Sequence, residues 1–100
     1  METLVTHNFS ALKQQYPTVI SQMNRVFNAH EFILELARQN QTLYVEALYS
    51  YKGGNPFQTV HQLLATFLND FIQLVQRYGD DPDSPDIWTK HKGCSRWMKI

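Results

Sequence analysis

The sequence predicts one mainly helical α+β domain, with three to five helices followed by a short C-terminal β-hairpin. Apolar residues recur three and four positions apart through most of residues 9–75, which is the spacing of one helix face. Residues 28–31 and 55–58 have the pattern of helix-capping boxes. Two short β-compatible runs at the end of the chain flank Lys92 and Gly93, which is typical of a hairpin.

The length and composition are those of one folded domain. The chain has 100 residues, enough for a single core, so we expect one domain over residues 1–100, with 1–7 disordered and 86–100 forming the hairpin. Of these residues, 43% are apolar and 13% aromatic, which excludes a disordered protein. No apolar run approaches the roughly 18 residues of a membrane span. The N-terminus lacks the pattern of a signal peptide, and the single cysteine, Cys94, fits a reducing compartment, so we expect a cytoplasmic protein.

The formal net charge is zero, which argues against strong binding to nucleic acid. The charges are nevertheless unevenly placed, because an acidic cluster precedes an acid-free, basic C-terminal segment. The acids of the cluster are Asp80, Asp81, Asp83 and Asp86, and the cations after it are Lys90, Lys92, Arg96 and Lys99. The basic segment is either a solvated tail or an element that contacts phosphates.

The first helical pattern starts at Phe9 and is interrupted by Pro17, whose ring clashes with the preceding turn of a helix. We expect a short helix to about Gln15 and a second one from Pro17 to near Asn24, with a single kinked helix as the alternative. Residues 25–27 can form one short extended segment.

The next helix is predicted to begin after Asn28, which forms a capping box with Glu31. Residues 38–42 are polar, so the chain either forms one helix over 29–51 or two helices with a tight joint, the second capped by Thr42. The helical spacing of the apolar residues before residues 38–42 is poorly continued by those after them, which favours two helices. Gly53 and Gly54 end this unit, and the second glycine can take the left-handed conformation that terminates helices.

The helix predicted over residues 56–71 has the strongest signals in the chain. Asn55 is its expected cap, Pro56 suits its first position, and Gln58 completes a capping box. Its apolar stripe consists of Phe57, Val60, Leu64, Phe67, Leu68 and Phe71. Its outer face carries no charge and consists of Gln58, Thr59, Gln62, Ala65, Thr66 and Asn69. The helix could extend to Arg77, or residues 73–78 could instead form a strand.

The end of the chain is predicted to be a loop followed by the hairpin. Residues 79–85 are rich in Gly, Asp and Pro and read as a loop. Residues 87–90 and 96–100 are the expected strands, joined by a turn at Lys92 and Gly93. Trp88 and Trp97 can pair across the hairpin or pack back on the helices.

This order of elements resembles the winged helix-turn-helix superfamily. Residues 28–37 correspond to the helix after the first short strand, 56–68 to the recognition helix and 86–100 to the wing. The run from Thr59 to Leu64 is similar to the Thr-Val-x-x-x-Leu run that opens many recognition helices. The resemblance covers about residues 10–100 and departs from the family at residues 41–54, which stand where the family's turn is often short.

The resemblance implies a double-stranded DNA-binding or regulatory protein, with the third helix in the major groove and the wing along the backbone. The positions that match the base-reading face are Gln58, Thr59, Gln62 and Thr66. The positions that match phosphate contacts are Lys90, Lys92 and Arg96, with Lys52 just ahead of the helix. Because the reading helix carries no Lys or Arg, DNA binding is expected to be weak and salt-sensitive. The alternative is a protein-interaction module, in the form of a homodimer or with another partner, on the same fold.

Other chemistry has little support in the sequence. His30 and His61, with the acids near His30, suggest metal or acid–base chemistry, but the zinc-hydrolase pattern His-Glu-x-x-His is absent. His91 and Cys94 have half of a zinc spacing, without a second pair. We therefore expect no enzymatic activity, no metal and no cofactor.

Overall fold

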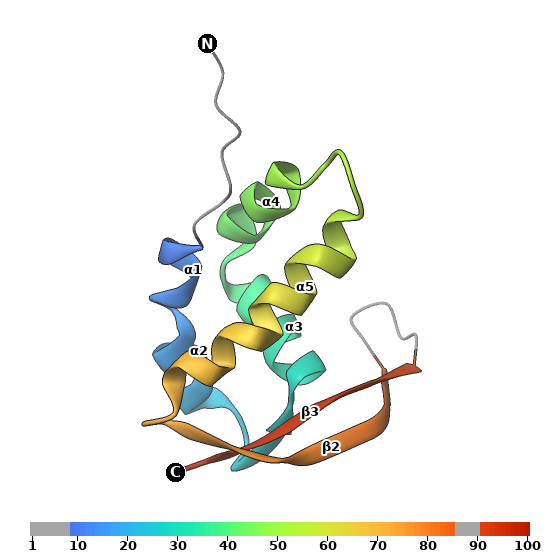
Figure 1. Ribbon diagram of the computed structural model, residues 1–100. Helices are drawn as coiled ribbons and strands as arrows, with labels where there is room; N and C mark the ends of the chain where they lie inside the picture. Colours follow the sequence, from blue (N-terminus) through green and yellow to red (C-terminus); the bar gives the residue numbers. More distant parts are fainter. Residues whose placement is uncertain (1–8, 86–90) are drawn as a thin grey trace.

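The computed structural model describes residues 9–85 and 91–100, which form two layers, with the helices on one side of an antiparallel sheet (Figure 1). The α-helices are α1 (Ser10–Lys13), α2 (Tyr16–Gln22), α3 (Ala29–Gln39), α4 (Gln41–Ser50) and α5 (Pro56–Thr66), and a 3₁₀-helix, η1, spans Phe67–Phe71. The strands are β1 (Val26–Asn28), β2 (Val75–Pro85) and β3 (His91–Lys99). The predicted α+β class with a C-terminal hairpin is thus confirmed. None of the described helices is long and apolar enough to cross a membrane.

The sheet has the strand order β1-β3-β2, so the last strand lies in the middle. Strand β1 pairs with β3 in antiparallel register, with Phe27 opposite Trp97. Strand β2 pairs with the other edge of β3, with Arg77 opposite the same tryptophan. A segment from the first third of the chain therefore extends the C-terminal hairpin into a three-stranded sheet.

The core lies between the sheet and the helices, and Tyr16 of α2 is one of its central side chains. Its ring stacks on Phe71, with 4.9 Å between centroids, and meets the edge of Phe32 at 4.7 Å. Its hydroxyl donates a hydrogen bond of 2.5 Å to the carbonyl oxygen of Leu64 in α5. The other large, fully buried side chains include Leu12, Val19, Phe27, Leu36, Val60, Leu68, Val75 and Trp97.

The N-terminal elements agree with the sequence. The helical region is interrupted between α1 and α2, as predicted. Pro17 stands in the first turn of α2, where its missing N–H is not needed. The extended segment is β1. The capping box is present, because Asn28 Oδ1 accepts from the Glu31 N–H at 2.9 Å and Glu31 Oε1 accepts from the Asn28 N–H at 2.9 Å.

The helical region after Asn28 is divided in two, as the broken apolar phase predicts. Helices α3 and α4 meet at Asn40, whose backbone angles of φ −134° and ψ 54° are not helical. The Asn40 amide donates to the carbonyl oxygen of Leu36 at 3.1 Å and so satisfies one of the last carbonyls of α3. The predicted cap at Thr42 is wrong, because α4 begins at Gln41.

Two predictions for the turn before α5 are wrong. The only positive φ among the described glycines is at Gly79, so Gly54 does not take the left-handed conformation, and its N–H instead donates to Tyr51 O at 3.1 Å. Asn55 makes no side-chain cap, since its amide donates to Gln58 Oε1 at 2.9 Å. Both amide side chains are exposed here, and pairing with each other competes with capping.

Helix α5 is shorter than the predicted helix over 56–71. It ends at Thr66, and the chain tightens into η1, so the extension to Arg77 is wrong and the strand alternative is right from Val75 onward. The middle of the apolar stripe is buried, but Phe57 at its start is 44% exposed. The first turn of α5 thus reaches past the core, and Phe57 contacts the edge of His61 instead.

The hairpin is present, but its predicted boundaries are wrong. Residues 79–85, predicted as a loop, belong to β2, and Gly79 takes a φ of 93° where the pairing shifts register. Gly, Asp and Pro mark irregularities inside this strand rather than its end. Strand β3 runs through Lys92 and Gly93, so the predicted turn there is wrong. Residues 1–8 and 86–90 lie outside the described part of the chain, and with them the predicted disordered N-terminus, the strand at 87–90 and Trp88.

Candidate functional site

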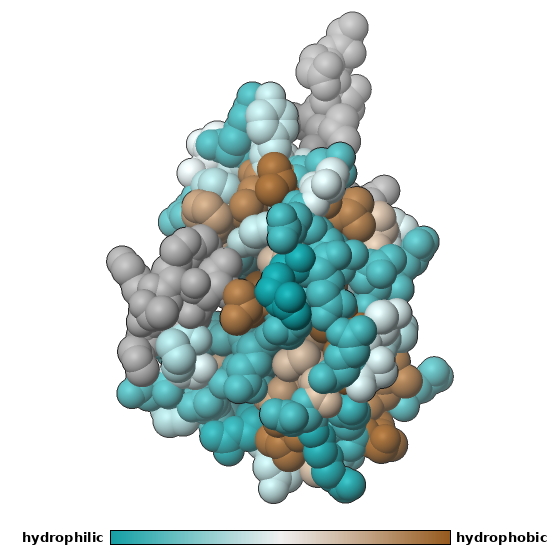
Figure 2. Space-filling view, turned by 180° about the vertical axis from the view of Figure 1, so that it is seen from behind, coloured by the Kyte–Doolittle hydropathy of each residue, from teal (hydrophilic) through white to brown (hydrophobic). Residues whose placement is uncertain are grey.

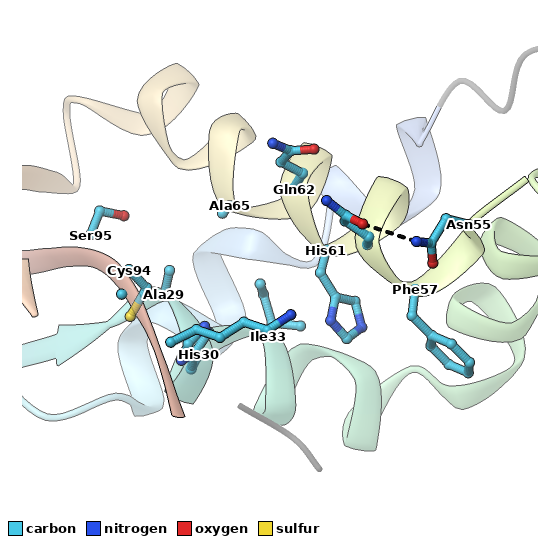
Figure 3. Close-up of a pocket in the computed structure, with 13 residues that line it drawn as sticks. Ala29, His30, Ile33, Asn55, Phe57, His61, Gln62, Ala65, Cys94 and Ser95 are labelled. Carbon is cyan, nitrogen blue, oxygen red and sulfur yellow. Dashed lines mark hydrogen bonds between the residues drawn. The ribbon is translucent and has the colours of Figure 1, made fainter. Parts of the chain in front are cut away.

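A groove with a volume of about 680 Å³ opens between the start of α3, the exposed side of α5 and strand β3. We call it the α3–α5–β3 groove. Figure 3 shows it with His30 and Cys94 toward one end and with His61 and Phe57 toward the other. It is the concave site where the predicted reading helix and the hairpin meet.

Helix α3 contributes Ala29, His30 and Ile33 to the groove. The capping box begins the helix at Ala29, and Ile33 follows one turn later on the same side, so the first turn of α3 forms one wall. Ala29 and Ile33 are buried and apolar. The buried ring nitrogen Nδ1 of His30 has no hydrogen-bond partner within the described part of the chain.

Helix α5 forms the opposite wall with side chains spaced three and four residues apart. The described lining residues from α5 and the residue before it are Asn55, Phe57, Gln58, His61, Gln62 and Ala65. This face combines neutral amides with the exposed ring of Phe57. It therefore offers hydrogen-bond donors and acceptors beside apolar surface, without a charge.

His61 is held by an aromatic pair from α4. Its Nε2 lies 2.6 Å from the Tyr44 hydroxyl, and the two rings stack with centroids 5.7 Å apart. Burial raises the pKa of Tyr44 to about 12, so this hydroxyl stays protonated at neutral pH. The contact fixes the orientation of His61 and ties α5 to α4.

Strand β3 closes the groove with Lys92, Gly93, Cys94 and Ser95. Lys92 is exposed, whereas Cys94 is half-buried and has a free thiol. No carboxylate occurs among the described lining residues, so Lys92 is their one group that is always charged at neutral pH.

Two acids, Glu31 and Asp81, belong to a network centred on Asn28, at the junction of β1 and α3. The Asn28 amide donates to Asp81 Oδ2 at 3.1 Å and to Ser84 Oγ at 2.9 Å. The hydrogen bond from Asn28 holds the pKa of the Asp81 carboxyl below its ordinary value, and the charges of Arg96 and His30 act in the same direction. Strand β2 is thus fastened to the start of α3, next to the groove.

The structure brings together three of the predicted DNA-binding residues, because Gln58, Gln62 and Lys92 line the same groove. Thr59 is half-buried and lies off the groove. Thr66 is exposed, but its hydroxyl donates to the carbonyl oxygen of Gln62 at 2.8 Å. Of the four residues predicted to read bases, only Gln58 and Gln62 therefore line the groove.

The other predicted cations are dispersed. Lys52 contacts Tyr49, with a hydrogen bond of 2.9 Å to its hydroxyl and 4.3 Å from Nζ to the ring centroid. Arg96 is half-buried on β3, opposite Asn28. Lys90 lies outside the described residues.

Sequence reasoning missed two features of this region. Arg77 is a further cation on the hairpin, 5.9 Å from the ring centroid of Trp97 and 2.6 Å from Asp80. His30, His61 and Cys94 share one groove, although the sequence suggested pairing Cys94 with His91. Because these three residues are far apart in the chain, no local spacing pattern in the sequence predicts that they share a site. Within the described residues, no cluster of three or more His, Cys, Asp or Glu side chains could hold a metal ion.

Comparisons with known proteins assign no family to this chain. No protein-family model matches it, and no curated protein or solved structure matches it either. Any function must therefore be argued from the residues and their geometry.

Proposed function

We propose that this chain is a small, non-enzymatic DNA-binding domain that inserts α5 into the major groove and lays the hairpin of β2 and β3 along the phosphate backbone. The observation that carries the proposal is that Gln58 and Gln62 of α5 line the same groove as Lys92 of the hairpin. Glutamine can pair with adenine through two hydrogen bonds, and lysine binds phosphate. One surface therefore presents both kinds of contact.

The topology supports the same function. A helix, a short strand, further helices and a terminal hairpin follow each other, and the sheet order β1-β3-β2 sets the hairpin beside α5 (Figure 1). This is the arrangement in which winged helices present a reading helix next to a wing. Helix α4 stands between α3 and α5, where the family's turn is often short.

The charge of the hairpin limits the affinity. Its described part carries Arg77, Lys92, Arg96 and Lys99, but also three aspartates at positions 80, 81 and 83. Arg77 pairs with Asp80, and Lys99 Nζ donates to carbonyl oxygens at the end of α2. Two phosphate contacts, from Lys92 and Arg96, correspond to a slope of about −2 for log affinity against log salt.

Fluorescence anisotropy with a labelled random duplex tests this proposal. Binding at low salt should be lost in the double variant Lys92→Ala/Arg96→Ala. It should be retained in Arg38→Ala, which removes an exposed cation of α3 that pairs with Glu35 outside the hairpin. If the wild-type chain does not bind at low ionic strength, the proposal is wrong.

A second candidate function is self-association, which we propose on the exposed apolar side chains of α4. Val45 is 59% and Tyr49 66% exposed, and they stand four residues apart on one side of the helix. In the view of Figure 2, hydrophobic residues form separate small patches among polar ones. Light scattering should then show a dimer that dissociates in Val45→Glu, and a monomer at all concentrations would exclude this candidate.

The free thiol of Cys94 supports a cytoplasmic location for either function, because that compartment keeps thiols reduced.

A further inference from the structure

We propose that the α3–α5–β3 groove binds a small organic anion, namely a carboxylate carried on a flat apolar body. This inference does not depend on DNA binding. The groove has a volume of about 680 Å³, which lies within the range of about 300–1,000 Å³ for small-molecule sites.

The apolar part of the groove fits a flat ring. Ala29 and Ile33 are buried in one wall, and Ala65 lines the other. At one end the ring of Phe57 is 44% exposed, and it contacts His61 in an edge-on arrangement. An aromatic body between these walls would cover the exposed ring face and remove apolar area from water.

The polar part favours an anion. Lys92 supplies a positive charge at the rim, and the amides of Gln58 and Gln62 supply neutral donors. No described lining residue is a carboxylate. Two acids near the start of α3 accept hydrogen bonds from Asn28, Glu31 from its backbone and Asp81 from its side chain.

His30 adds a specific reason to expect a polar ligand group. His30 lines the groove, and its buried Nδ1 lacks a hydrogen-bond partner within the described residues. A buried polar atom without a hydrogen bond costs free energy. When Nδ1 carries a proton, a carboxylate oxygen can accept its hydrogen bond and recover this cost. A wholly apolar ligand would leave this nitrogen without a partner. A cationic ligand would meet the charge of Lys92, with no carboxylate among the described lining residues to compensate it.

Isothermal titration calorimetry with 2-naphthoate and with its neutral analogue 2-naphthamide tests the proposal on the full chain. The two probes share the apolar body and differ in charge. The carboxylate should bind at least about tenfold more tightly, because charge-assisted hydrogen bonds are the stronger kind. Acetate, which lacks the apolar body, should not compete with 2-naphthoate.

Two variants with matched controls locate the site. Lys92→Gln should weaken 2-naphthoate binding about tenfold, whereas Lys52→Gln, which removes an exposed cation away from the groove, should not. Gln62→Trp should block the groove and abolish binding, whereas Gln41→Trp on the exposed side of α4 should not. Circular dichroism checks that each variant is folded.

Three results would overturn the proposal. They are equal affinity for the carboxylate and the carboxamide, no binding of 2-naphthoate to the folded wild-type chain, and binding that survives both Lys92→Gln and Gln62→Trp. Each can be observed without DNA, so the outcome is distinguishable from that of the anisotropy experiment.

Discussion

Asn28 and Asp81 are 53 residues apart in the chain and are joined by a side-chain hydrogen bond of 3.1 Å. The same asparagine caps α3 and donates to Ser84, so one residue that is only 8% exposed links β1, α3 and β2. Through these contacts, the start of α3 and the hairpin keep a fixed spacing at the α3–α5–β3 groove.

Substitution of Asn28 should therefore destabilise the whole domain. Asn28→Ala removes a helix cap, which contributes about 1 kcal/mol, and two further hydrogen bonds of about 1 kcal/mol each. We expect urea denaturation to show a loss of about 2–3 kcal/mol in the free energy of unfolding. Asn55→Ala is the control, because Asn55 precedes α5 without capping it and should cost far less. Equal losses in the two variants would contradict the linking role of Asn28.

Asp81 should make the free energy of unfolding depend on pH in the acidic range. Its pKa is lower in the folded than in the unfolded chain, chiefly through the hydrogen bond from Asn28, so its contribution is present above the unfolded pKa of about 4. This contribution is lost as the pH falls through the lower, folded pKa. Asp81→Asn should therefore flatten the fall of the free energy of unfolding below about pH 4. Identical profiles for wild type and Asp81→Asn would refute the effect.

The hydroxyl of Tyr16 should stabilise the packing of α2 against α5. Tyr16→Phe keeps the ring between Phe32 and Phe71 but leaves the Leu64 carbonyl without its 2.5 Å partner. We expect a loss of about 1–3 kcal/mol in the free energy of unfolding, measured by denaturant titration. Tyr49→Phe, which removes an exposed hydroxyl, should change stability by no more than about 0.5 kcal/mol. If the two substitutions cost the same, the buried hydrogen bond contributes nothing.

Two glycines should respond in opposite ways to alanine. Gly79 has a φ of 93°, a conformation that strains any other residue, so Gly79→Ala should lower stability by about 1 kcal/mol or more. Gly53 has no such φ and nothing within 4 Å of an added Cβ, so Gly53→Ala should be neutral or stabilising. Thermal denaturation of both variants measures the difference. A destabilised Gly53→Ala with an unaffected Gly79→Ala would show that the irregular stretch of β2 has another conformation.

The amides of α5 should control sequence preference rather than general affinity for DNA. In Gln58→Ala/Gln62→Ala, binding to random duplex should be nearly unchanged, because phosphate contacts supply most of that affinity. Discrimination among sequences selected by the wild-type chain should fall, and each lost bidentate contact should cost about 1–3 kcal/mol. Competition experiments with selected and scrambled duplexes measure this, and undiminished discrimination would remove α5 from the reading role.

The local signals in the sequence predicted most of the helical part. Pro17 separates α1 from α2, and the capping box of Asn28 and Glu31 starts α3, because each acts within one helical turn. The same kind of signal was wrong at Asn55, where an exposed side-chain pair with Gln58 replaces the cap. A capping pattern shows which hydrogen bonds are available, but not which competing bond forms.

The sheet and the groove depend on contacts that no local pattern records. Pairing of β2 with β3 places Asp81 opposite Cys94 and draws a Gly-, Asp- and Pro-rich segment into a strand. The addition of β1 places Phe27 opposite Trp97 and buries both, which fixes the register. Only this packing brings His30, His61 and Lys92 into one groove.

The amino-acid order alone was thus sufficient for the helices of the first half, the uncharged outer side of α5 and the α+β class. The tertiary structure decided where the hairpin lies, which cations are engaged and that a groove forms beside α5. The physical reason is the distance in sequence over which each effect acts. Caps and prolines act within one turn of helix, whereas strand register and groove shape depend on the packing of side chains that are far apart in the chain.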